Sequence, residues 1–128
     1  MNDKPVAVIT GASRGIGRSV AIALAAEGYD IAAIARSIDS EGMENLGPEV
    51  EKRGAEFFPI GLDISCTGCH KEVVQNILDR YGRIDFLVNN AGVLRDPRGT
   101  RFVDSRVETY RATIDTNVLG PLRVTQAL

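Results

Sequence analysis

A glycine-rich segment at residues 10–17 constrains the fold of this chain more than any other feature. It reads Thr-Gly-Ala-Ser-Arg-Gly-Ile-Gly and lies between an apolar run and a helical pattern. A strand that turns directly into a helix points unpaired backbone N–H groups, and the positive end of the helix dipole, at whatever lies over the turn. Glycine is needed because the backbone turns tightly at Gly11, admits a phosphate near Gly15 and packs helix on strand at Gly17. The segment predicts a pyrophosphate site, with an ordinary glycine-rich turn as the alternative.

Strands and helices alternate along the chain. Four apolar runs predict strands at residues 6–9, 31–35, 56–60 and 84–88. Helical patterns lie between and after them, at residues 15–27, 41–53, 67–81 and from about 105. Short apolar strands separated by helices indicate a parallel sheet covered on both faces. We predict a doubly wound α/β fold that forms one domain over residues 1–128.

Three prolines disturb this pattern. Pro48 follows Gly47 inside the second helix and predicts that this helix is kinked or split. Pro59 is unusual for a central strand. Pro121, after Gly120, predicts a kink just beyond Asn117 in the last helical pattern.

Composition limits the possible partners. The chain has 128 residues, is 44% hydrophobic and carries 15 basic and 17 acidic residues, for a net charge of −2. The basic residues are dispersed, which argues against nucleic acid and membrane surfaces as partners. The N-terminus lacks a basic segment followed by an apolar stretch, and no apolar run approaches the roughly 20 residues that span a bilayer. We therefore expect a cytoplasmic protein with a small-molecule partner.

The ends of the predicted strands resemble one known family. Ligands of open α/β sheets bind at the carboxyl ends of the strands. The first end carries the glycine turn, the third Asp63-Ile64 and the fourth the segment Asn-Asn-Ala-Gly at residues 89–92. These features resemble the cofactor turn, the adenine-contacting Asp and the Asn-Asn-Ala-Gly signature of the short-chain dehydrogenase/reductase family. The general look of the sequence is similar to 3-oxoacyl-acyl-carrier-protein reductases. The resemblance implies a Rossmann-type parallel sheet, truncated here after about four strands.

The resemblance also implies a dinucleotide site. Asp63 would accept a hydrogen bond from the adenine amino group, the Ile64 N–H would bind the adenine ring, and residues 90–92 would line the ribose. Asn117 matches the family's active-site Asn, which holds a water of the proton relay, although a plain helix-kink residue is the alternative. The predicted cofactor-binding residues are Gly11, Ser13, Arg14, Gly15, Ile16, Gly17, Arg36, Asp63, Ile64, Asn90, Ala91 and Gly92.

The second strand end distinguishes the two possible cofactors. NAD enzymes typically place Asp or Glu there to bind the ribose hydroxyls. This chain has Ala35 and Arg36 instead, and Arg36 together with Arg14 could form charge-assisted bonds to a 2′-phosphate. The sequence therefore favours NADP(H) over NAD. The alternative is that these arginines are solvated and that Asp39 or Glu41 serves NAD.

The family's catalytic Tyr-x-x-x-Lys and its upstream Ser are not found. Each tyrosine has the wrong residue four positions later, in the pairs Tyr29 and Ala33, Tyr81 and Asp85, and Tyr110 and Ile114. We expect the chain to be the cofactor-binding half of an oxidoreductase that transfers hydride between NADP(H) and a carbonyl or alcohol, possible substrates being 3-oxoacyl thioesters. By itself it should turn over no substrate. The alternative is a non-catalytic NADP(H)-binding or subunit-pairing module.

We expect self-association both of the full-length form and of the isolated chain. We expect the full-length form to be a homo-oligomer. A truncated sheet also leaves an open edge and an unpacked final helix, so the isolated chain should aggregate or form dimers.

Residues 66–70, Cys-Thr-Gly-Cys-His, match the spacing of covalent c-type haem attachment. That chemistry requires export, and the sequence shows no export signal. A redox or metal-binding pair is a second alternative, because thiols at a helix N-terminus have lowered pKa values. The sequence contains no further Cys or His to complete a zinc site. The favoured interpretation is that these residues are incidental to a helix start.

Overall fold

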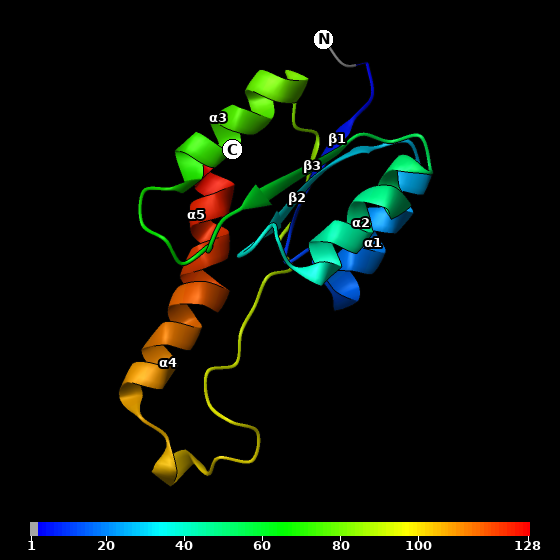
Figure 1. Ribbon diagram of the computed structural model, residues 1–128. Coiled ribbons are helices and arrows are strands. Elements are labelled where there is room, and N and C mark those ends of the chain that lie inside the picture. The colour runs from blue at the N-terminus through cyan, green and yellow to red at the C-terminus, as the bar shows by residue number, and fades with distance from the viewer. Residues whose placement is uncertain (1–2) are drawn as a thin grey trace.

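A sheet of four parallel strands organises the structure, a computed structural model that describes residues 3–128 (Figure 1). The strand order is β3-β2-β1-β4, which places β1 and β2 in the centre. The strands are β1 (Val6–Thr10), β2 (Asp30–Ala35), β3 (Phe57–Gly61) and β4 (Phe86–Val88). The predicted parallel α/β sheet is confirmed, with strand boundaries within two residues of those expected.

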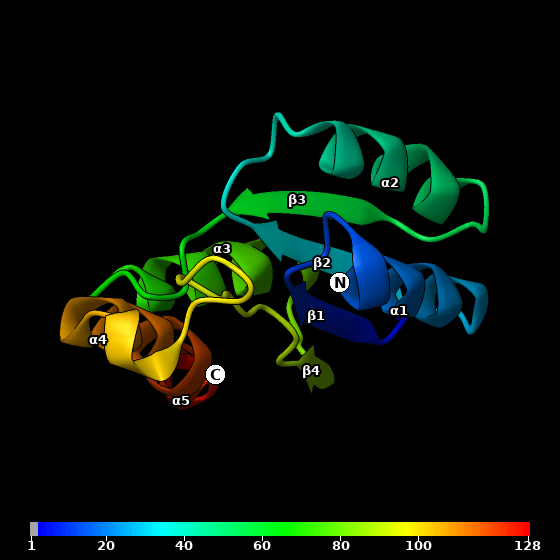
Figure 2. The same cartoon turned by 90° about the horizontal axis from the view of Figure 1, so that it is seen from below.

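Helices cover both faces of the sheet (Figure 2). On one face lie α1 (Gly15–Ala26) and α2 (Glu41–Glu51), and on the other α3 (His70–Tyr81) and α5 (Gly120–Ala127). Strand β1 serves both cores, since alternate side chains of a strand point to opposite faces. Ile9 belongs to the α1–α2 side and Val8 to the α3–α5 side. All residues of β1 and β2 are buried, as the continuous apolar runs predict.

Helix α2 is one uninterrupted helix, so of the two outcomes expected at Pro48, a kink or a split, the split is wrong. Its start is capped by Ser40, whose hydroxyl accepts the Met43 N–H at 3.3 Å. A Cβ at Gly47 would lie 3.0 Å from the Phe57 ring, so glycine allows the helix to approach β3 closely. The buried side chains of this helix, Leu46 among them, supply packing that offsets the roughly 3 kcal/mol cost of an internal proline.

The edge position of β3 explains its proline. Pro59 pairs in register with Ala33 of β2, and within residues 3–128 no strand lies on the other side of β3. An edge strand tolerates proline because one row of its N–H groups needs no partner strand.

Helix α3 begins at His70, three residues later than expected, because Gly68 adopts a turn conformation with φ +87°. The helix ends as predicted at Gly82, which has φ +74° and donates its N–H to the Leu78 carbonyl at 2.7 Å. Within residues 3–128, no helix combines the length and apolar character needed to cross a bilayer.

The last helical pattern forms three consecutive pieces. They are α4 (Val107–Ile114), a π-helical segment (Asp115–Leu119) and α5, which has Pro121 in its first turn. The kink expected beyond Asn117 is therefore a π-helical distortion that includes Asn117 itself. None of the residues of α4 is buried, and Figure 1 shows this helix projecting away from the sheet.

Candidate functional site

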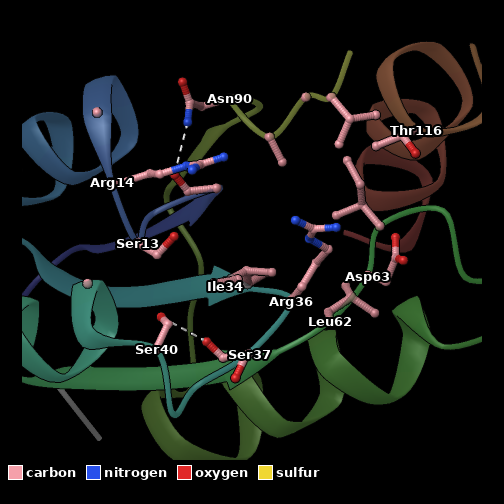
Figure 3. Close-up of a pocket in the computed structure, with 18 of the residues that line it drawn as sticks. Ser13, Arg14, Ile34, Arg36, Ser37, Ser40, Leu62, Asp63, Asn90 and Thr116 are labelled. Atoms are coloured by element: carbon pink, nitrogen blue, oxygen red, sulfur yellow. Dashed lines mark hydrogen bonds between the residues drawn. The ribbon is translucent and has the colours of Figure 1, made fainter. Parts of the chain in front are cut away.

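A cavity of about 840 Å³ lies at the carboxyl ends of the strands (Figure 3). Residues from the ends of β1, β2 and β3 and from the segment after β4 line it together. Every predicted cofactor-binding residue lines this cavity except Gly17. The structure thus brings segments that are more than 80 residues apart in sequence to one place, although their binding role stays a prediction.

The three glycines of the first turn are each required for a different steric or conformational reason. Gly11 and Gly15 have φ +65° and +59°, which favours glycine at both positions. A Cβ on Gly11 would lie 2.9 Å from the Ala91 Cα, whereas one on Gly15 would meet no atom within 4 Å. Gly17 lies under the turn, where a Cβ would fall 2.2 Å from the Gly11 oxygen. Gly17 is therefore a packing residue, and Gly15 is the position open to a ligand.

The start of α1 leaves its backbone donors available. Arg14 occupies the N-cap position without a side-chain capping bond, and the first turn contains no acidic residue. This differs from α2, where Ser40 provides a cap. The first N–H groups of a helix need acceptors, and an anion satisfies them. These donors suit an anion such as a phosphate group, and phosphate binding above Gly15 stays a prediction.

Thr10 and Asn90 join the ends of β1 and β4. The Thr10 hydroxyl accepts the N–H groups of Asn90 and Ala91, each at 3.0 Å. The Asn90 side-chain amide donates to the Thr10 and Gly11 carbonyls at 3.2 and 3.1 Å. The hydrogen bonds of the Thr10 hydroxyl and of the Asn90 side chain therefore fix the Asn-Asn-Ala-Gly segment against the glycine turn.

Asn117 makes a paired contact with the same segment. Its Oδ1 accepts the Val93 N–H and its Nδ2 donates to the Val93 carbonyl, both at 2.7 Å. Val93 and the neighbouring Thr116 line the cavity, whereas Asn117 does not. The structure shows Asn117 fastening the π-helical segment to the cavity wall, and its catalytic role stays a prediction.

Asp63 is an ionised acceptor in this cavity. The Ser65 hydroxyl and N–H donate to its Oδ1 at 2.7 and 3.0 Å, and these bonds hold the pKa of Asp63 below its usual value. The nearby guanidinium groups of Arg36 and Arg95 lower that pKa further. Figure 3 shows the Arg36 side chain extending from the end of β2 toward Asp63.

The sequence missed several residues of the cavity wall. Arg95 lines it, with only its place in a polar loop after Gly92 as a signal. Gly42 lines it because α2 begins against the glycine turn, where a Cβ would lie 2.0 Å from the Ser13 oxygen. The other wall residues outside the predicted set are Ile34, Ala35, Ser37, Ser40, Leu62, Val93, Leu94 and Thr116, together with Glu41, which the sequence offered as the alternative ligand for NAD.

No tyrosine within residues 3–128 lines the cavity. Tyr81 is buried, with its ring 6.3 Å from that of Phe58. Tyr29 and Tyr110 pack against other phenylalanine rings. The described residues therefore bring no phenol to the cavity that could donate a proton to a substrate.

The cysteine motif forms a disulfide rather than an incidental pair of thiols. Cys66 and Cys69 are bonded, with their Cα atoms 5.9 Å apart. His70 is buried, and its Nε2 lies 2.9 Å from the Ile64 carbonyl oxygen. This arrangement does not fit haem attachment, because both sulfurs and the imidazole already have protein partners. The part of the chain that the structure describes contains no cluster of three or more candidate metal ligands.

Comparison with known proteins assigns the family. The family model described as short chain dehydrogenase matches residues 5–128. The 3-oxoacyl-[acyl-carrier-protein] reductase FabG of Thermotoga maritima is 38% identical over 94% of this chain and 47% of its own length. The FabG protein of Staphylococcus epidermidis is 36% identical over 89% of this chain and 45% of its own length. The chain spans about half the length of these curated relatives.

Solved structures agree with this result. A 3-oxoacyl-[acyl-carrier protein] reductase from Brucella melitensis in complex with NAD has a TM-score of 0.90 and 36% identity, covering 99% of this chain and 48% of that one. The alcohol dehydrogenase of Thermococcus sibiricus complexed with 5-hydroxy-NADP has a TM-score of 0.85 and 39% identity, covering 96% of this chain and 51% of that one. The chain therefore belongs to the short-chain dehydrogenase family.

Proposed function

We propose that this chain is the cofactor-binding part of an NADP(H)-dependent oxidoreductase that acts on carbonyl or alcohol substrates. The similar proteins named 3-oxoacyl-[acyl-carrier-protein] reductases support 3-oxoacyl thioesters as the substrate class. The dispersed charge of the chain is compatible with a cytoplasmic homo-oligomer that binds neither nucleic acid nor membrane, and we include this in the proposal.

The cavity fits a dinucleotide in one orientation. The pyrophosphate would lie above Gly15, where the free N–H groups of α1 point and a Cβ would meet nothing within 4 Å. The adenine would lie against Asp63 and Ile64, and the adjoining ribose along residues 90–92. When bound, the dinucleotide supplies the hydride. The residues of this chain bind and orient it.

One observation carries the preference for NADP(H): Arg14 and Arg36 line the cavity, and the end of β2 presents no carboxylate. A guanidinium group forms strong charge-assisted bonds to phosphate, whereas a carboxylate would repel it. Glu41 also lines the cavity and is the residue that could favour NAD. The wall carries three arginines, counting Arg95, against the two carboxylates of Asp63 and Glu41.

Binding measurements on arginine variants test this preference. We expect Arg14→Ala and Arg36→Ala each to weaken NADPH binding by about 1.5–3 kcal/mol, roughly tenfold to a hundredfold, with little change for NADH. Arg111→Ala removes the same charge from α4, outside the cavity wall, and should change neither affinity. NADH binding as tightly as NADPH to the unmodified protein, or weakened NADH binding in Glu41→Gln alone, would contradict the proposal.

A non-catalytic NADP(H)-binding or subunit-pairing module is the second candidate. The observation that favours it is the lack of a tyrosine on the cavity wall within residues 3–128. We expect no oxidation of NADPH when residues 1–128 alone are mixed with oxoacyl, quinone or sugar carbonyls. Turnover that Asn117→Ala abolishes would show that this part of the protein is catalytic and would remove the second candidate.

A further inference from the structure

The Cys66–Cys69 disulfide lies beside the predicted adenine site, between the end of β3 and the start of α3. The Cys66 N–H donates to the Asp63 carbonyl at 2.9 Å. On the other side of the disulfide, His70 contacts the Ile64 carbonyl oxygen. The four-residue ring closed by the disulfide is therefore hydrogen-bonded to Asp63 directly, and His70, the residue that follows the ring, contacts Ile64.

Both cysteines are partly exposed, and Thr67 and Gly68 between them are exposed. Both cysteines line a second hollow, of about 520 Å³, between β3 and α3. Leu62 and Asp63 line this hollow and the large cavity alike, so a single stretch of chain separates the cysteines from the predicted adenine site.

The position of Cys66 and Cys69 favours thiol–disulfide exchange. Cys69 occupies the N-cap position of α3, where the helix dipole stabilises a thiolate. The Cα separation of 5.9 Å lies within the range that a disulfide spans. In the reducing cytoplasm where we place this protein, disulfides are usually transient and are often redox sensors.

We propose that Cys66 and Cys69 form a thiol–disulfide exchange site for small thiols and their disulfides, and that its redox state changes the affinity for the dinucleotide. In reduction, one small thiolate attacks a sulfur of the pair, breaks the Cys66–Cys69 bond and forms a mixed disulfide. A second small thiolate then attacks the sulfur of the small thiol in that mixed disulfide. The small disulfide leaves, two electrons have passed to the protein, and two protons end on Cys66 and Cys69.

The effect on binding follows from the loss of the closed ring. In the dithiol form the segment from Asp63 to His70 keeps its hydrogen bonds but has more conformational freedom, which binding must then remove. We expect the dithiol form to bind NADPH about fivefold more weakly, at the low end of typical coupling between two sites. This second part rests on the proposed function, whereas the exchange site itself does not.

Graded mixtures of reduced and oxidised glutathione test the exchange site on the purified protein. After trapping with an alkylating reagent, mass spectrometry should count two free thiols per chain at the reducing end and none at the oxidising end. Cys66→Ser and Cys69→Ser, treated with oxidised glutathione, should each retain one glutathione adduct per chain. A thiol count in the unmodified protein that stays the same across all mixtures would overturn the proposal, and this measurement needs no variant to fold.

NADPH titrations of the two redox forms test the coupling. The Cys66→Ser/Cys69→Ser double variant is the control, since its affinity should not respond to the glutathione mixture. Equal dissociation constants for the oxidised and reduced forms would overturn the coupling. Lack of NADPH binding in both forms would contradict the proposed function instead, and the thiol count would still decide whether the exchange site exists.

Discussion

Two regions of the molecule differ in how far their apolar side chains are buried. The N-terminal region, formed by β1, β2, α1 and α2, buries most of them in one core, with Ile16 at 75% exposed as an exception. The C-terminal region, residues 86–128, leaves most of its large apolar side chains exposed, among them Phe102 at 81% and Val107 at 61%. Most apolar side chains of the first region pack within the described residues, whereas much of the apolar surface of the second region beyond β4 has no packing partner there. Mutations should therefore change folding stability in the first region and association in the second.

The largest expected effect contrasts two leucines. Leu46 in α2 is fully buried, whereas Leu122 in α5 is 56% exposed. Leu46→Ala should lower the free energy of unfolding by about 2–5 kcal/mol, because it removes buried surface and leaves a cavity. Leu122→Ala should lower it by no more than about 0.5 kcal/mol. Urea denaturation followed by circular dichroism measures both, and equal losses would remove the distinction between buried and exposed apolar surface.

A smaller effect is expected where the two regions meet. Thr10→Val removes the hydroxyl that accepts the N–H groups of Asn90 and Ala91, leaving two part-buried donors without this partner. We expect a loss of about 1–3 kcal/mol in the free energy of unfolding and faster hydrogen exchange at both amides. Thr10→Ser keeps the hydroxyl and should keep slow exchange. Unchanged hydrogen exchange in Thr10→Val would show that the Thr10 hydroxyl does not hold the ends of β1 and β4 together.

Asn117 provides a test inside the C-terminal region. Asn117→Ala removes both hydrogen bonds to Val93 at an exposed position, so we expect a loss of no more than about 1 kcal/mol. Hydrogen exchange should quicken at Val93 and in the π-helical segment while β1 and β2 stay protected. Asn76→Ala, at an exposed position on α3, is the matched control. Loss of protection in β1 would mean that the two regions unfold as one unit.

The smallest effect on stability is expected at the exposed apolar surface. Phe102→Ser and Val107→Ser should change the free energy of unfolding by less than about 0.5 kcal/mol. They should nevertheless reduce self-association, measured by analytical ultracentrifugation, because large exposed apolar patches promote association. Unchanged association with a clear loss of stability would show that this surface is part of a packed core.

Local patterns predicted most of the fold. Each strand was visible as a short apolar run, and Gly82 was recognisable as a helix end because glycine favours the left-handed conformation that it adopts. Pro48 misled because its local cost is smaller than the packing of α2 against the sheet. The start of α3 was placed too early because the turn at Gly68 has no periodic signal of its own.

The candidate site likewise contains residues that could be predicted from the sequence and residues that could not. Glycine and polar residues that directly follow a strand could be predicted, because parallel strands bring their carboxyl ends to one edge. Gly42 could not, since its closeness to Ser13 depends on how α2 packs beside α1. Arg95 could not either, because the path of the loop after Gly92 follows from contacts made elsewhere, such as the pairing of Asn117 with Val93.

The sequence by itself determined the alternation of strands and helices, the glycine-rich turn between β1 and α1 and the family, since these depend on spacing along a continuous chain. Only the tertiary structure decided that the Thr10 hydroxyl binds the Asn90 N–H and that Asn117, which does not line the cavity, is hydrogen-bonded to Val93. It also decided that Cys66 and Cys69 form a disulfide close to Asp63. These contacts depend on side-chain directions and on distances between segments, which sequence spacing alone does not specify.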